Sequence, residues 1–156
     1  MIINCRGQVF FEVSGHRAIL AGRRAELKAA LVHDALGLRA INAPFALAVA
    51  CDMPFLNPRL LRYMADLTRD YDALVPSIGG IWQPLHTIYA KACLTTVEDL
   101  LARGLLALTD LLTRVRVRAL RFATIRRFDP EGLSFLNINE PDDLMRVRAI
   151  TYPASG

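Results

Sequence analysis

One six-residue stretch of the chain, Phe45 to Ala50, is apolar at every position. It is too short for a free-standing helix, and continuous hydrophobicity is typical of a strand that is covered on both faces. The preceding residues 23–40 are rich in Ala, Leu, Arg and Lys and contain no proline, which favours a helix. After the strand, Asn57 and Pro58 supply an N-cap and a first-turn proline for a helix that reaches about residue 68.

The second half of the chain alternates between strand and helix patterns in the same way. Residues 73–76 and 86–89 predict two strands on either side of the turn signal Gly79-Gly80. Residues 94–112 have helical spacing with a break near Gly104, and apolar positions 115, 117 and 119 predict a further strand. Residues 134–138 predict a last strand, and residues 139–143 then begin a last helix with a cap, a proline and two acidic residues.

Strands that alternate with helices predict an α/β sandwich with a mostly parallel sheet. No linker, repeat or low-complexity segment interrupts the chain, so we expect residues 1–156 to form a single domain.

The composition narrows the class of protein. Apolar residues make up 53% of the chain and charged residues 22%, which excludes disorder. No apolar run approaches the ~20 residues of a membrane span, and the first residues lack the features of a signal peptide, so we expect a cytoplasmic protein. The net charge of +4 is carried mainly by arginine, since Lys28 and Lys91 are the only lysines. Arginine side chains bind phosphate oxygens well, so the charge favours a phosphate-bearing partner. The sequence contains no recognised nucleic-acid-binding motif that would identify this partner as a nucleic acid.

Asp52 is the first candidate for chemistry. It follows the apolar strand, and in open parallel sheets ligands bind beyond the carboxyl ends of the strands. Pro54 restricts Met53 to extended conformations, so the chain leaves the strand sharply. Mg²⁺ takes one or two protein carboxylates and completes its coordination with water and substrate phosphates, so a single aspartate suffices. The alternative is that Asp52 caps the following turn.

Two further polar segments are candidates for ligand binding. Gln83, Pro84 and His86 follow the glycine turn at the start of a strand, where Gln83 and His86 present donors. The alternative for these residues is an ordinary hairpin turn with an exposed Gln and a half-buried His. Asn137 and Asn139 are two residues apart, so along a strand both amides face the same side. Asn139 is also the predicted N-cap of the last helix.

Six arginines gather in and after the strand predicted near residue 117, namely Arg114, Arg116, Arg118, Arg121, Arg126 and Arg127. They have two interpretations. Charges on an edge strand prevent aggregation, whereas a basic face also binds phosphate.

Three motifs in this order and spacing carry a resemblance to a known family: ALAVACDMPFLNPRLL, WQPLHTIY and FDPEGLSFLNINEPDDL. They resemble the molybdenum cofactor guanylyltransferases, which belong to the Rossmann-like nucleotidyltransferases, and the resemblance covers residues 37–147. It implies a Rossmann-like three-layer sandwich. It also implies an enzyme that transfers GMP from GTP to molybdopterin and releases pyrophosphate.

The resemblance assigns roles to individual residues. Asp52 is implied to be the catalytic residue and to hold Mg²⁺ beside the nucleotide, and Asn4 matches an asparagine near that nucleotide. The expected substrate-binding residues on the pterin side are Gln83, Pro84, His86, Asn137 and Asn139. GTP and molybdopterin are the implied partners, with molybdoenzymes or their chaperones in addition; neither nucleic acid nor a membrane is expected.

The N-terminal region departs from the family pattern. The glycine-rich LAGGxSxRMGxxK loop expected ahead of Asn4 is not found, and residues 30–36 stand where the family has GPLAG. Residues 20–24, Leu-Ala-Gly-Arg-Arg, with Lys28 beyond them, lack the second glycine and the Met-Gly, so we expect an ordinary strand-to-helix turn there. We therefore expect an N-terminally truncated chain that binds Mg-GTP weakly.

Three functions follow from this mixed match. The chain is an active guanylyltransferase, completed by a partner chain or a second protomer. Alternatively it is a non-catalytic homologue that binds pterin or a partner enzyme, or it is a related molybdopterin cytidylyltransferase.

Overall fold

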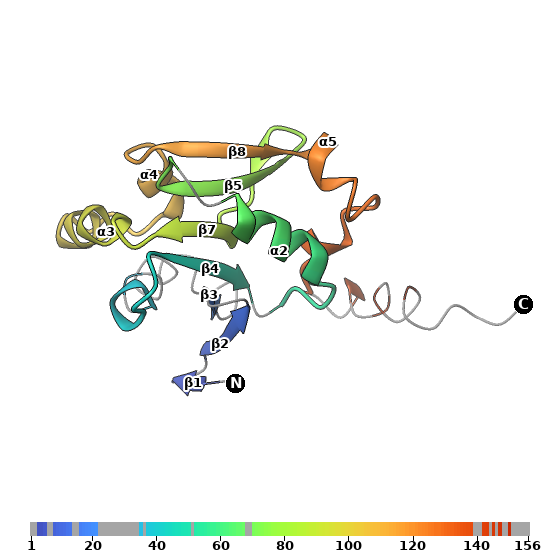
Figure 1. The fold of residues 1–156 in the computed structure, drawn as a ribbon, viewed down its shortest axis with the longest axis horizontal. Helices are drawn as coiled ribbons and strands as arrows, with labels where there is room; N and C mark the ends of the chain where they lie inside the picture. Colours follow the sequence, from blue (N-terminus) through green and yellow to red (C-terminus); the bar gives the residue numbers. More distant parts are fainter. Residues whose placement is uncertain are drawn as a thin grey trace, which may run out of the picture.

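The computed structural model describes residues 3–5, 8–13, 16–21, 35, 37–50, 52–67, 70–138, 142–143, 145, 147 and 150. Its eight described strands form one sheet in the order β1-β2-β3-β4-β7-β5-β6, with β8 pairing to β5 (Figure 1). The strands are β1 (Ile3–Cys5), β2 (Gln8–Val13), β3 (His16–Ala21), β4 (Phe45–Ala50), β5 (Ala73–Ile78), β6 (Ile81–Trp82), β7 (His86–Ala90) and β8 (Val117–Arg121).

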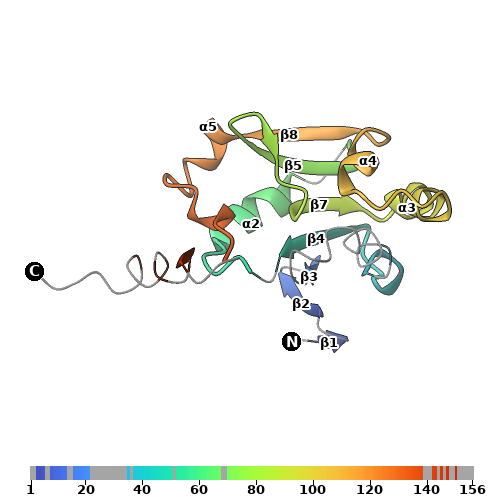
Figure 2. The same ribbon diagram turned by 180° about the vertical axis from the view of Figure 1, so that it is seen from behind.

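Helices cover both faces of the sheet and make the predicted three layers. The side chains of β4 alternate between two apolar clusters: Ala46 and Ala48 pack with α3 (Cys93–Ala102) and α4 (Leu108–Leu112). Leu47 and Val49 pack on the other face with α2 (Pro58–Asp66) and α5 (Phe122–Ile125). The two opposite views show α2 in front of the sheet in one and α4 in the other (Figures 1 and 2). The strand predicted from continuous hydrophobicity is thus buried on both faces, and the α/β sandwich is confirmed.

Within the sheet the strand directions are mixed rather than mostly parallel. The pairs β3–β4 and β5–β8 are parallel, and the other described pairs are antiparallel. One cause is the turn at Gly79 and Gly80, whose φ angles of +58° and +82° are easily adopted only by glycine. This turn reverses the chain after β5, so that β6 and β7 both run antiparallel to β5.

Two helix boundaries lie where local chemistry predicts them. Asn57 caps α2, since its Oδ1 accepts the main-chain N–H groups of Arg59 at 3.0 Å and Leu60 at 3.2 Å. The break between α3 and α4 lies at Gly104, which has a φ of +72°. Of the helix predicted over residues 23–40, the described residues 35 and 37–40 are helical, and the others lie outside the description. No described helix is long and apolar enough to cross a membrane.

The strand predicted at residues 134–138 is wrong. Leu133–Phe135 form the short 3-10 helix η2, and no described strand pairs with this segment. Gly132 precedes η2 in the left-handed conformation with a φ of +71°, and the Asp129 carboxylate accepts the N–H groups of Leu133 and Ser134. These N–H groups are therefore committed to a turn and cannot enter a sheet ladder.

The arginine-rich strand β8 pairs with β5 alone among the described strands, and therefore lies at an edge. Two arginines in or next to β8 have structural partners. The Arg116 guanidinium, directly before β8, binds both carboxylate oxygens of Asp72, at 3.0 and 3.1 Å, and Arg118 lies 5.6 Å from the ring centre of Tyr71. The Arg116 hydrogen bond holds the pKa of Asp72 below its usual value. These contacts agree with the edge-strand interpretation and leave phosphate binding by the remaining arginines as a prediction.

Candidate functional site

The end of β4 and the start of β7 meet at one edge of the sheet. Because the two strands are antiparallel, His86 at the start of β7 pairs with Val49 near the end of β4. The N–H of Ala50 donates to the carbonyl of Leu85 at 2.9 Å, so the contact between the two chain segments continues one residue beyond the paired strands. Asp52, half-buried, follows directly. In a wholly parallel sheet the starts and ends of strands lie at opposite edges, so the antiparallel direction of β7 is what brings these segments together.

A third segment, after η2, reaches the same edge. The N–H of Ile138 donates to the carbonyl of Asp52 at 2.9 Å, which fixes Asn137 next to the end of β4. Asn137 is half-buried, and its Oδ1 is enclosed without a hydrogen-bond partner among the described residues. Such an oxygen costs free energy unless a ligand, water or another group satisfies it.

Asp129 holds this segment in place. Only 6% of the residue is exposed, and its two carboxylate oxygens accept the N–H groups of Leu133 at 3.0 Å and Ser134 at 2.8 Å. The Nδ2 of Asn57 donates to the carbonyl of Phe128 at 2.9 Å and ties the preceding residues to the start of α2. Asp129 is not among the site residues predicted from the sequence; its signal there is an Asp-Pro-Glu-Gly turn ahead of the Asn-rich motif.

His86 is completely buried beside this turn. Its ring lies 4.5 Å from the ring of Phe135, centre to centre, and neither ring nitrogen has a hydrogen-bond partner within 3.5 Å among the described residues. Burial lowers the pKa of His86 to about 4, while the Asp129 carboxylate and the nearby Ser134 main chain act in the opposite direction. At neutral pH the imidazole is therefore uncharged and offers one donor and one acceptor.

Together with Ser134, whose Oγ is also enclosed and without a partner among the described residues, His86 and Asn137 form what we call the polar cluster. These side chains come from the start of β7, from η2 and from the segment after η2. Amide, hydroxyl and neutral imidazole groups both donate and accept hydrogen bonds. His86 and Ser134 are fully buried and Asn137 is half-buried, so Asn137 is the member of the cluster that can present a polar, uncharged group to a ligand.

The other predicted site residues have different environments. The main chain of Gln83 donates to the carbonyl of Pro76 at 2.9 Å and accepts from the Thr87 hydroxyl at 2.8 Å, and the carbonyl of Pro84 accepts from the Tyr89 hydroxyl at 3.0 Å. These contacts are those of a structural turn, and they leave the Gln83 side chain half-buried.

Asn4 is not brought to the polar cluster. It lies in β1, and β2 and β3 separate β1 from β4, which at the usual strand spacing corresponds to about 14 Å across the sheet. The last predicted site residue, Asn139, lies outside the described residues, as do Gly22, Arg23, Arg24 and Lys28 of the loop-like segment.

A magnesium ion is compatible with the donors at the end of β4. Among the described residues, no group of three or more His, Cys, Asp or Glu side chains comes together to hold a metal. Mg²⁺ needs fewer protein ligands than that, since it keeps waters and binds substrate phosphates. The Asp52 carboxylate, one oxygen of which is enclosed, is an oxygen donor of the kind it prefers.

Comparison with known proteins decides the family. Residues 14–118 match the family described as the MobA-like NTP transferase domain. This chain belongs to the MobA-like NTP transferase family. The resemblance derived from the motifs is thereby confirmed, and membership in a nucleotidyltransferase family indicates the use of a divalent metal ion in general terms.

Individual relatives of this MobA-like chain have consistent names. A probable molybdenum cofactor guanylyltransferase of Pelotomaculum thermopropionicum is 36% identical over 76% of this chain and 57% of its own length. The molybdenum cofactor guanylyltransferase of Desulfosudis oleivorans is 29% identical over 86% of this chain and 67% of its own length. The chain thus spans only part of the length of these relatives.

Solved structures support the same fold. The molybdopterin-guanine dinucleotide biosynthesis protein A of Archaeoglobus fulgidus superposes with a TM-score of 0.71 at 30% sequence identity, over 78% of this chain and 62% of that protein. A putative protein of Aquifex aeolicus superposes with a TM-score of 0.62 at 15% identity, which is a likeness of fold alone.

The burial of His86 makes stability depend on pH. Its pKa is about 4 in the folded chain and about 6.5 in the unfolded chain, so between these values the unfolded chain binds more protons. The free energy of unfolding should therefore fall as the pH drops from 6.5 to 4, by about 3 kcal/mol in total. Urea unfolding followed across this range measures the effect.

His86→Gln should flatten this pH dependence, whatever its effect on stability at pH 7. An unchanged slope in His86→Gln would show that His86 is not buried in its neutral form.

Proposed function

We propose that this chain is a molybdenum cofactor guanylyltransferase, which transfers GMP from GTP to molybdopterin and releases pyrophosphate. The names of its relatives support the activity. The observation that carries the proposal is the hydrogen bond between Ile138 and Asp52, because it joins the two motifs that the reaction needs at one edge of the sheet. One motif offers a carboxylate for a metal, and the other offers an amide for the pterin.

The reaction requires positioning and charge neutralisation more than proton transfer. An oxygen of the terminal phosphate of molybdopterin attacks the α-phosphorus of GTP, the bond from that phosphorus to the β-phosphate oxygen breaks, and pyrophosphate leaves. The attacking phosphate is already anionic, so no general base is needed. His86, the histidine of the polar cluster, is uncharged at neutral pH, which agrees with a reaction that needs no general base.

In this proposal the Asp52 carboxylate holds Mg²⁺ at the end of β4. When bound, Mg²⁺ neutralises charge on the triphosphate and orients the α-phosphate for in-line attack. Asp52 also accepts the Ile138 N–H through its main chain, so the same residue positions the pterin-binding segment.

The pterin lies against Asn137 in this proposal. A pterin ring presents adjacent donors and acceptors, and the carboxamide of Asn137 complements both. His86 is fully enclosed, so we assign it a positioning role through its contact with Phe135 rather than contact with the ligand. Gln83 and Asn139 remain predicted neighbours of the same ligand.

Asp52→Asn should abolish most of the GMP transfer. It keeps the shape of the side chain and the main-chain bond to Ile138 but removes the charge that holds the metal. Loss of several kcal/mol of charge stabilisation corresponds to a decrease in kcat/KM of about 100-fold or more. The assay is formation of molybdopterin guanine dinucleotide from GTP and molybdopterin with Mg²⁺.

Glu131→Gln, which neutralises an exposed carboxylate before η2, is the control and should retain the parent rate. Equal rates for Asp52→Asn and the parent would contradict the role of Asp52. A parent chain that forms no dinucleotide product would contradict the proposed activity itself.

Asn137→Ala should weaken molybdopterin binding by ~1–3 kcal/mol, because it removes a polar contact from an enclosed position. The melting temperature should change little, since the Oδ1 of Asn137 has no partner among the described residues. Ligand affinity and melting temperature are compared with those of Asn42→Ala, which removes the same group from an exposed position. Parent-like affinity in Asn137→Ala would show that the pterin does not lie there.

A further inference from the structure

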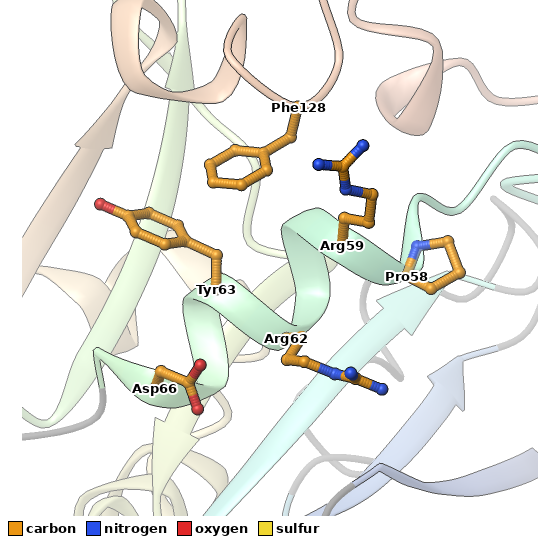
Figure 3. A pocket seen from close by; sticks show the side chains of 6 residues that line it. All are labelled: Pro58, Arg59, Arg62, Tyr63, Asp66 and Phe128. Atoms are coloured by element: carbon orange, nitrogen blue, oxygen red, sulfur yellow. The ribbon is translucent and has the colours of Figure 1, made fainter.

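A separate pocket of about 430 Å³ lies along the face of α2 that points away from the sheet (Figure 3). The buried residues of α2 are Leu60, Leu61, Met64 and Ala65, which pack on the sheet. The pocket uses the opposite face and is lined by Pro58, Arg59, Arg62, Tyr63, Asp66 and Phe128. Its volume falls within the ~300–1,000 Å³ of small-molecule sites.

One end of the pocket is strongly basic. Arg59 and Arg62 are one helical turn apart, and neither guanidinium makes a hydrogen bond or ion pair in the part of the chain that the structure describes. Arg126 and Arg127 are exposed and directly precede Phe128. The N-terminus of α2 adds partial positive charge at the Arg59 end, and its first turn contains no acidic residue. This end of the pocket is therefore suited to a phosphate group.

The middle of the pocket is aromatic. The rings of Tyr63 and Phe128 lie 4.8 Å apart, centre to centre, and are tilted by 32°. The hydrogen bond from Asn57 to the carbonyl of Phe128 fixes Phe128 above α2, beside the side chain of Arg59 (Figure 3). Aromatic side chains held in this way offer π-surfaces on which a nucleobase stacks.

The far end of the pocket carries a hydrogen-bond acceptor. Asp66 follows Arg59 by seven residues, which is about 10.5 Å along the helix axis. Its carboxylate is an acceptor for the N–H groups at the edge of a nucleobase. Along the pocket, the arginines are therefore followed by the aromatic rings and then by the Asp66 carboxylate. A mononucleotide presents its phosphate, its base and the edge of its base in the same order.

We propose that this pocket binds a mononucleotide whose base carries N–H groups at its edge. The phosphate lies on Arg59 and Arg62, the base lies against Tyr63 and Phe128, and the edge of the base is directed to Asp66. This site is separate from the polar cluster, and it requires neither Asp52 nor a metal ion.

The test is calorimetric titration of the whole chain in EDTA with GMP, and with guanosine and inorganic phosphate as the two halves of that ligand. GMP should bind with a stoichiometry of one and about tenfold or more tighter than either half. Arg59→Gln/Arg62→Gln should weaken binding of both GMP and phosphate by about tenfold or more. Asp66→Asn should weaken GMP binding by about threefold to tenfold and leave phosphate binding unchanged.

Arg114→Gln/Arg121→Gln removes the same charge from exposed positions on and next to β8 and should bind GMP like the parent. Arg59→Gln/Arg62→Gln should keep the parent rate of GMP transfer, which separates this proposal from the proposed transferase activity. The proposal is overturned if GMP does not bind in EDTA or if phosphate binds as tightly as GMP. It is also overturned if the Arg114/Arg121 variant loses as much affinity as the Arg59/Arg62 variant.

Discussion

The candidate site depends on one main-chain hydrogen bond, from the N–H of Ile138 to the carbonyl of Asp52. It joins the end of the most buried strand to a segment near the end of the described chain. Without it, Asp52 and Asn137 would belong to separate loops, and the proposed metal-binding carboxylate and the proposed pterin-binding amide would have no fixed separation. Catalysis by positioning requires such a fixed geometry, because a displacement of about 1 Å is enough to lower the rate greatly.

The surrounding structure stabilises this bond from two sides. The Asp129 carboxylate binds two N–H groups of η2, and hydrogen bonds to a charged group contribute about 1.5–3 kcal/mol each. His86 packs on Phe135 and is buried in its neutral form, which avoids the cost of enclosing a charge. The reversed direction of β7 places His86 where it can make this contact. The geometry of the site therefore follows from strand direction, a capped turn and a buried neutral histidine together.

The sequence predicts the features that short-range chemistry determines. The apolar run from Phe45 to Ala50 predicted a strand covered on both faces. Asn57-Pro58 predicted the start of a helix, and Gly104 predicted the end of one. Each of these three predictions depends on a few adjacent residues. The prediction of a strand at residues 134–138 was wrong because the same apolar pattern occurs in strands and in turns. Here an upstream aspartate, Asp129, caps a turn. Strand direction and the distance of Asn4 from β4 depend on pairing between distant segments, which no local pattern contains. For the same reason the motifs indicated Asp52 and Asn137 as site residues, but the part played by Asp129 required the structure.

In the proposed site a metal ion held by Asp52 lies beside Asn137, and paramagnetic NMR measures this proximity. Mn²⁺ replaces Mg²⁺ and broadens the signals of nearby nuclei. Titration of the labelled chain with Mn²⁺ and a nucleotide should selectively broaden the Asn137 side-chain amide and the Ile138 N–H. The signal of Gly104, in the loop between α3 and α4, should remain sharp, and Asp52→Asn should abolish the broadening. Broadening that spares residues 137 and 138, or that persists in Asp52→Asn, would show that the metal ion does not lie at Asp52 beside Asn137.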